Sequence, residues 1–87
     1  PEILSNLGGL YVQFGQYDEA IARLERALAR SPDLRPARYH LARALLSQRR
    51  FAEAEAQERA LLAREPDSIA THLRLAHALL MQGKLDE

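Results

Sequence analysis

The side chains that could bind a metal ion are few and widely spaced. Three histidines, His40, His72 and His77, are the candidates, and the chain contains no cysteine. His72 and His77 are separated by about 140° around a helix, so they cannot hold one ion from a single helical face. His40 and His77 could meet across neighbouring helices, but two histidines without a carboxylate form a weak site. We therefore expect exposed histidines and no bound metal.

Motifs for phosphate binding and for nucleophilic catalysis are equally weak. Gly8-Gly9 comes closest to a phosphate-binding loop, but it falls within an amphipathic segment, where glycine serves close packing. No serine stands in a turn that resembles a nucleophile elbow. We expect no enzymatic activity and no cofactor.

The charge pattern argues against a nucleic-acid partner and against membrane insertion. Twelve basic and twelve acidic residues give a net charge of zero. Many arginines alternate with acids at helical spacing, which is typical of a solvated, salt-bridged surface. The apolar runs are far shorter than a transmembrane helix requires.

Proline and glycine divide the chain into short helices. Pro32 and Pro66 disfavour the helical conformation of the residue before them, so helices must end there. Gly15 and Gly83 follow apolar-periodic segments, where a helix C-terminus favours glycine. Two-residue turns at 16–17, 50–51 and 84–85 imply antiparallel neighbours. The expected helices span residues 2–14, 18–31, 36–48, 52–64 and 69–82.

The sequence repeats at a fixed interval, the one that separates Pro32 from Pro66. Leu7, Glu19 and Ala20 recur at this interval as Leu41, Glu53 and Ala54, and a third copy begins at Ile69. A period of this length, about 34 residues, indicates stacked supersecondary units, each burying its apolar face against the next.

These residues resemble the tetratricopeptide repeat family, and the first unit carries the resemblance best. Leu7-Gly8, Tyr11, Gly15, Tyr17-Asp18-Glu19-Ala20, Ala27 and Pro32 stand at the spacing of the family's signature. The resemblance implies an all-α, right-handed superhelical solenoid of antiparallel helix pairs, with units at 1–34, 35–68 and a partial unit at 69–87. In two departures from the pattern, Arg49 replaces the turn glycine of the second unit and Glu58 stands where Leu24 stands.

Small residues are expected where helices cross. Gly8, Ala42 and Ala76 should seat the partner helix of each unit, and the core stripe of the first helix should comprise Leu4, Leu7, Gly8 and Tyr11. We expect Glu58 to point into solvent, because an unpaired buried carboxylate is costly.

In this family the first helices of successive units line a concave groove, where ligands usually lie. Helical periodicity defines a second stripe on these helices, separate from the core stripe. Its apolar members alternate with Tyr and Arg, the residue types that most often anchor interfaces, so we expect it to hold an amphipathic or acidic peptide. The stripe comprises Ser5, Gly9, Val12, Gln13, Tyr39, Arg43, Leu46, Ser47, Leu73, His77, Leu80 and Met81, with His40 and Arg74 at its border.

The family's carboxylate clamp, which grips the acidic C-terminal tail of heat-shock proteins, is not expected. It requires Lys or Asn at the positions of Ser5, Gly9, His40 and Ala70, and Arg at that of Arg74. Only Arg74 matches.

The alternative function is a structural or spacer segment of a larger repeat protein attached to an enzyme or to an envelope or secretion assembly. Leu75, Ala76 and Leu79 should face a second helix of which only Asp86 and Glu87 are present. We therefore expect part of a longer repeat protein, and a homo-oligomer formed through the C-terminal edge is a second way to cover this face. The sequence specifies neither the partner nor the compartment, whether cytoplasmic or bacterial periplasmic.

Overall fold

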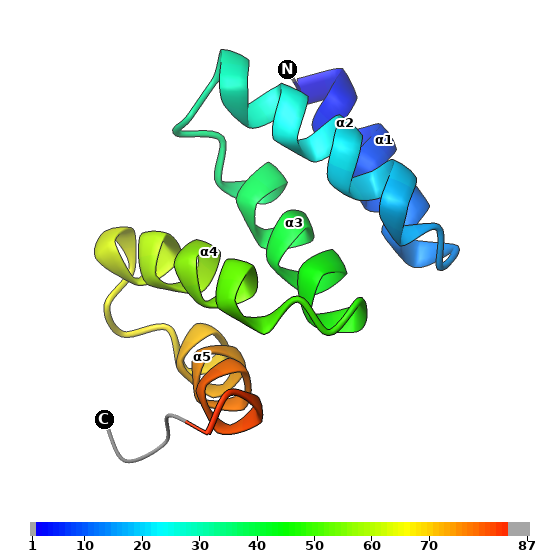
Figure 1. The fold of residues 1–87 in the computed structure, drawn as a ribbon. Coiled ribbons are helices and arrows are strands. Elements are labelled where there is room, and N and C mark those ends of the chain that lie inside the picture. The colour runs from blue at the N-terminus through cyan, green and yellow to red at the C-terminus, as the bar shows by residue number, and fades with distance from the viewer. Residues whose placement is uncertain (1, 84–87) are drawn as a thin grey trace.

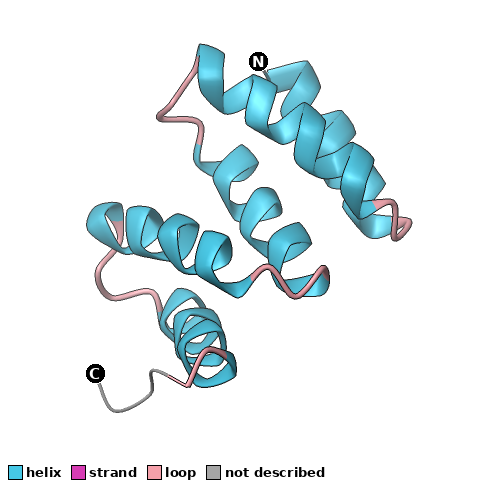
Figure 2. Cartoon of the chain, in the orientation of Figure 1, coloured by secondary structure: helices cyan, strands magenta, loops and turns pink. Residues whose placement is uncertain are grey.

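The computed structural model describes residues 2–83 as a stack of helices without a strand among them (Figures 1 and 2). The helices are α1 (Glu2–Gln13), α2 (Tyr17–Arg30), α3 (Arg35–Ser47), α4 (Phe51–Arg64) and α5 (Ile69–Met81). Each begins and ends within one residue of its expected bounds, which confirms the expected helical repeat solenoid. No helix in this part of the chain is long and apolar enough to cross a membrane.

The central helix α3 joins the two ends of the stack. Figure 1 shows it between the α1–α2 pair and the α4–α5 pair, and it packs on α1, α2 and α4. Helix α5 packs on α4, and no comparable packing joins it to α3. The stack is therefore closed between α1 and α3 and open between α3 and α5.

The turns within the helix pairs need a left-handed residue. Gly15 has φ 77° and Gly83 has φ 73°, as expected for glycine after a helix C-terminus, and Arg49 takes the same conformation with φ 60°. This conformation costs a non-glycine residue roughly 1–2 kcal/mol. The α1–α2 and α3–α4 turns contain three residues rather than the expected two. The turn expected at 84–85 lies outside the described residues.

Loops between the pairs are held by bonds that recur with the repeat. Arg38 Nη2 donates to the carbonyl oxygen of Pro32 at 2.9 Å, and at the equivalent positions of the next repeat His72 Nε2 lies 2.7 Å from the carbonyl oxygen of Pro66. Ser68 caps α5, because its hydroxyl oxygen accepts a hydrogen bond from the Thr71 backbone N–H at 3.3 Å.

The core depends on the small residues expected at the crossings. A Cβ on Gly8 would overlap the side chain of Leu24, which is fully buried. Ala20, Ala42 and Ala54 have no exposed surface, so they too lie where helices meet.

The exposed apolar surface of α1 forms a stripe along the whole helix. Leu7 was expected in the core but is 38% exposed, and it shares the stripe with Ile3, Leu10 and Phe14, which are more exposed. The α3 equivalents of Ile3, Leu7 and Leu10 are buried: Ala37, Leu41 and Ala44. The expectation for the Leu4 side chain lies outside the described part of the structure.

The α5 edge, at the opposite end of the stack from α1, is less apolar than expected. Leu75 was expected to face a further helix but is buried in the α4–α5 pair. Ala76 is exposed and Leu79 is half-buried, as an uncovered face requires. The expected start of a further helix at Asp86 and Glu87 lies outside the described residues.

A candidate partner-binding face on α3 and α5

The expected binding stripe divides into a buried and an exposed part. Ser5 and Val12 are buried, so the expectation that they are exposed is wrong. They are buried because α1 packs directly on α3. Gly9, Leu46, His40 and Arg74 are half-buried, and the rest of the stripe is exposed: Gln13, Tyr39, Arg43, Ser47, Leu73, His77, Leu80 and Met81. The exposed part therefore lies mostly on α3 and α5.

Gly9 explains the close approach of α1 to α3. A Cβ at this position would lie 2.9 Å from His40 Nε2, so any larger residue would require the imidazole to shift. The pKa of His40 is lowered, first because burial disfavours the charged ring and second because Arg43 repels it. Both effects favour the neutral form of the ring, and its Nδ1 atom has no hydrogen-bond partner among the described residues.

Tyr39 is the centre of the exposed face. The guanidinium carbon of Arg74 lies 4.8 Å from the centre of the Tyr39 ring, and that of Arg43 lies 5.7 Å from it. Both distances are within the range of cation–π attraction. The ring also meets that of His40 edge-on, with 5.4 Å between the ring centres. Tyr39 thus links α3 to Arg74 of α5 and is still 36% exposed.

Glu58 was expected in solvent, and this expectation is wrong. Its side chain is fully buried and its Oε2 accepts a hydrogen bond from Arg74 Nε at 2.9 Å. Arg74 Nη2 also donates to Thr71 Oγ1 at 3.1 Å, and the Ser68 hydroxyl donates to the same oxygen at 2.9 Å. Burial of the carboxylate is tolerated because it is paired.

The Glu58 pair is incompletely satisfied. The Oε1 atom has no hydrogen-bond partner among the described residues. The pKa of Glu58 is raised, because the effect of burial exceeds the opposing effect of Arg74. Protonation of Glu58, which removes its negative charge, would weaken its hold on Arg74.

A hollow of about 380 Å³ opens between α3 and α5 beside Tyr39 and Arg74. Tyr39, Pro36 and Leu61 supply apolar surface, while Thr71 and Arg74 supply polar groups. At the opposite end of α5, the His77 ring meets Phe51 edge-on at 5.7 Å, and Arg49 lies over the same phenyl ring. An aromatic ring therefore lies beside an arginine at each of these two places, Tyr39 beside Arg74 and Phe51 beside Arg49.

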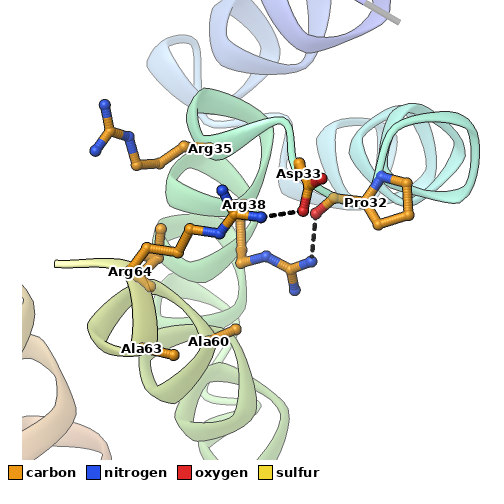
Figure 3. A pocket seen from close by; sticks show the side chains of 8 residues that line it. Pro32, Asp33, Arg35, Arg38, Ala60, Ala63 and Arg64 are labelled. Atoms are coloured by element: carbon orange, nitrogen blue, oxygen red, sulfur yellow. Dashed lines mark hydrogen bonds and ion pairs between the residues drawn. The ribbon is translucent and has the colours of Figure 1, made fainter.

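A second hollow, of about 210 Å³, lies between the α2–α3 loop and α4 (Figure 3). Its arginines are held within the protein: Arg64 pairs with Asp33, and Arg38 donates to Pro32 and, at 2.7 Å, to Gln57 Oε1. These contacts fix the loop on α4, so they serve the fold.

No cluster suited to a metal ion occurs within residues 2–83, since no three His, Cys, Asp or Glu side chains come together there. The sequence reasoning missed Glu58, Thr71 and Ser68 as members of the Arg74 network. The sequence did contain a signal for Glu58. Compared with the equivalent positions one repeat earlier, Glu58 replaces Leu24 and Arg74 replaces His40, so the acid and the base of the ion pair appear together.

Comparison with known proteins identifies the fold family. Two family models described as tetratricopeptide repeat match the chain, one over residues 1–57 and the other over residues 39–87. No curated protein matches it. Repeats of this family are generally protein-interaction modules and are typically non-catalytic. With matches that together extend from one end of the sequence to the other, the chain belongs to the tetratricopeptide repeat family.

Proposed function

We propose that the protein binds a peptide or helical segment of a protein partner on its concave face, without catalysis of its own. One observation carries the proposal: Tyr39 remains exposed although two arginines contact its ring, and the adjoining surface of α5 is apolar. Leu73 is 67% exposed and Leu80 is 55% exposed. An aromatic ring with arginines beside apolar surface has the composition of an interface hot spot.

The experiment is selection of peptides from a displayed random library against the intact chain. The selected peptides are then measured with a Tyr39→Ala/Arg43→Glu variant whose helicity and melting temperature match those of the parent. Arg26→Glu on α2 is the control, because it makes the same charge change at an exposed residue away from this face. Binding that the first variant loses and the control keeps supports the proposal. Equal binding by both variants overturns it.

The uncovered face of α1 favours the second candidate function, a structural segment of a longer repeat array. Ile3, Leu7 and Leu10 are exposed on α1, while their equivalents in α3 are covered. Exposed apolar surface of this extent also favours self-association. Sedimentation of the parent and of a Leu7→Arg/Leu10→Arg variant tests whether this face associates with a second copy of the chain: a concentration-dependent dimer that the variant abolishes shows that it does, and a monomer at all concentrations argues against self-association.

A further inference from the structure

The hollow between α3 and α5 is lined by two arginines, and each of them forms an ion pair within the protein. Arg74 Nε donates to Glu58 Oε2 at 2.9 Å, and Arg35 pairs with Glu65, which also lines the hollow. Glu58 is not part of the lining and has no exposed surface. The positive charges of the lining are therefore balanced by carboxylates of the protein itself.

The hydroxyl groups of the lining are bonded to one another. Ser68 Oγ donates to Thr71 Oγ1 at 2.9 Å and accepts from the Thr71 backbone N–H at 3.3 Å, while Arg74 Nη2 donates to Thr71 Oγ1 at 3.1 Å. An apolar occupant of the hollow would leave these hydrogen bonds intact. The rest of the lining is apolar or aromatic and comprises Pro36, Tyr39, Leu61 and Ala70.

Glu58 controls the charge of this surface through Arg74. The side chain of Arg74 is 20% exposed, and its guanidinium carbon lies 4.8 Å from the centre of the Tyr39 ring. Without the carboxylate of Glu58, Arg74 would be an uncompensated cation in the wall of the hollow and would attract acidic groups. One repeat earlier the position of Glu58 is occupied by Leu24, which carries no charge. The charge of the hollow therefore depends on one buried residue of α4.

We propose that Glu58 determines which side chain the hollow accepts from a partner's peptide: by pairing with Arg74 it favours an uncharged, apolar or aromatic side chain over an acidic one. Glu58 is a positioning residue, because it is buried and acts only through Arg74. The inference rests on the proposed function, since Tyr39 and Arg74 belong to the same concave face. At about 380 Å³ the hollow has room for one bulky side chain. Of the two kinds of peptide expected from the sequence, amphipathic and acidic, it favours the first.

The first experiment identifies the peptide side chain that enters the hollow. Ala70 is exposed and lines the hollow, so Ala70→Leu should fill part of it. Ala76→Leu is the matched control, because Ala76 is exposed on the same helix and is not part of the lining. Peptides selected from the library against the parent are truncated to alanine at one position at a time. The truncation that matters should weaken binding to the parent and to Ala76→Leu, but have little effect on binding to Ala70→Leu.

The second experiment tests Glu58 with two versions of that peptide, which carry aspartate or asparagine at the position identified. Binding is measured at pH 8, which favours the carboxylate form of Glu58. The parent should bind the asparagine peptide more tightly, because a carboxylate would lose its hydration without gaining a free cation. In Glu58→Gln the ratio of the two affinities should shift towards the aspartate peptide by about tenfold. Glu25→Gln, at an exposed position on α2, should keep the ratio of the parent.

The ratio of affinities separates positioning from a purely structural role, because a general loss of packing weakens the binding of both peptides. Glu58→Gln/Arg74→Gln removes both charges, so it should restore the ratio of the parent. If Glu58→Gln does not fold, Glu58→Leu takes its place, because leucine occupies this position in the first repeat. A folded variant with an unchanged ratio refutes the inference, and so does a parent that prefers the aspartate peptide.

The same measurements separate a failure of this inference from a failure of the proposed function. Selected peptides that require Tyr39 but bind Ala70→Leu as tightly as the parent would uphold the proposed function and refute the hollow as a binding site. Failure to select any peptide would count against the proposed function and the inference together.

Discussion

The buried carboxylate of Glu58 makes the stability of the protein depend on pH in a direction that can be tested. Two effects compete at this residue: burial raises its pKa, and the ion pair with Arg74 lowers it. The effect of burial is the larger of the two, so the pKa of Glu58 in the folded protein lies above the ordinary value of 4.5. The folded state then binds a proton more tightly than the unfolded state.

The sign of the pH effect follows from this difference. As the pH falls from 7 through the raised pKa, Glu58 takes up a proton in the folded protein first, so its contribution to the free energy of unfolding increases. The increase ends below the unfolded value of 4.5, where both states are protonated. Because one proton is involved, the slope between the two pKa values cannot exceed about 1.4 kcal/mol per pH unit.

The assay is urea unfolding of the parent and of Glu58→Gln from pH 7 to pH 4.5. Glutamine keeps the size of the side chain and an oxygen that accepts from Arg74 but removes the titration. The difference in unfolding free energy, parent minus variant, should rise as the pH falls. Glu25→Gln, at an exposed position, controls for the loss of one acidic group. A difference that falls with falling pH would show that the ion pair outweighs burial and would refute the reasoning.

Three further perturbations follow from individual contacts. Gly8→Ala should destabilise the protein by about 1–3 kcal/mol in urea unfolding, because the new Cβ overlaps Leu24; an unchanged midpoint would mean that the α1–α2 crossing can relax. Ser68→Ala should cost about 1 kcal/mol by removing the cap of α5, and Ser68→Asp should restore most of it. In an NMR titration the His40 imidazole should have a midpoint below 6.5, which Arg43→Gln raises only in part because burial is the larger cause.

The sequence predicts the helices well because their ends are fixed locally. Pro32 and Pro66 stop helices wherever they occur, and Gly15 supplies a left-handed turn that few other residues adopt readily. The period of the repeat then determines which helices pair. None of these inferences requires the angle between successive pairs.

The binding face is less predictable from the sequence because it depends on the angle between successive helix pairs. Ser5 and Val12 belong to the stripe by periodicity, but their burial follows from the approach of α1 to α3, which Gly9 permits at His40. Glu58 is acceptable inside the protein only because Arg74 reaches it from another helix. Periodicity along one helix contains no information about such contacts between helices.

The connectivity of the stack also orders the helices by how readily they open. α3 has neighbours in α1, α2 and α4, whereas α5 packs chiefly on α4. In a linear array each helix is held by its nearest neighbours, so α5 can detach while the other helices remain folded. Amide hydrogens of α5 should therefore exchange with solvent deuterium early, and those of α3 only when the entire array unfolds. A partner that contacts both α3 and α5 would hold α5 in place and slow the exchange of its amide hydrogens. Binding could therefore be detected as protection of α5, the helix that opens most readily.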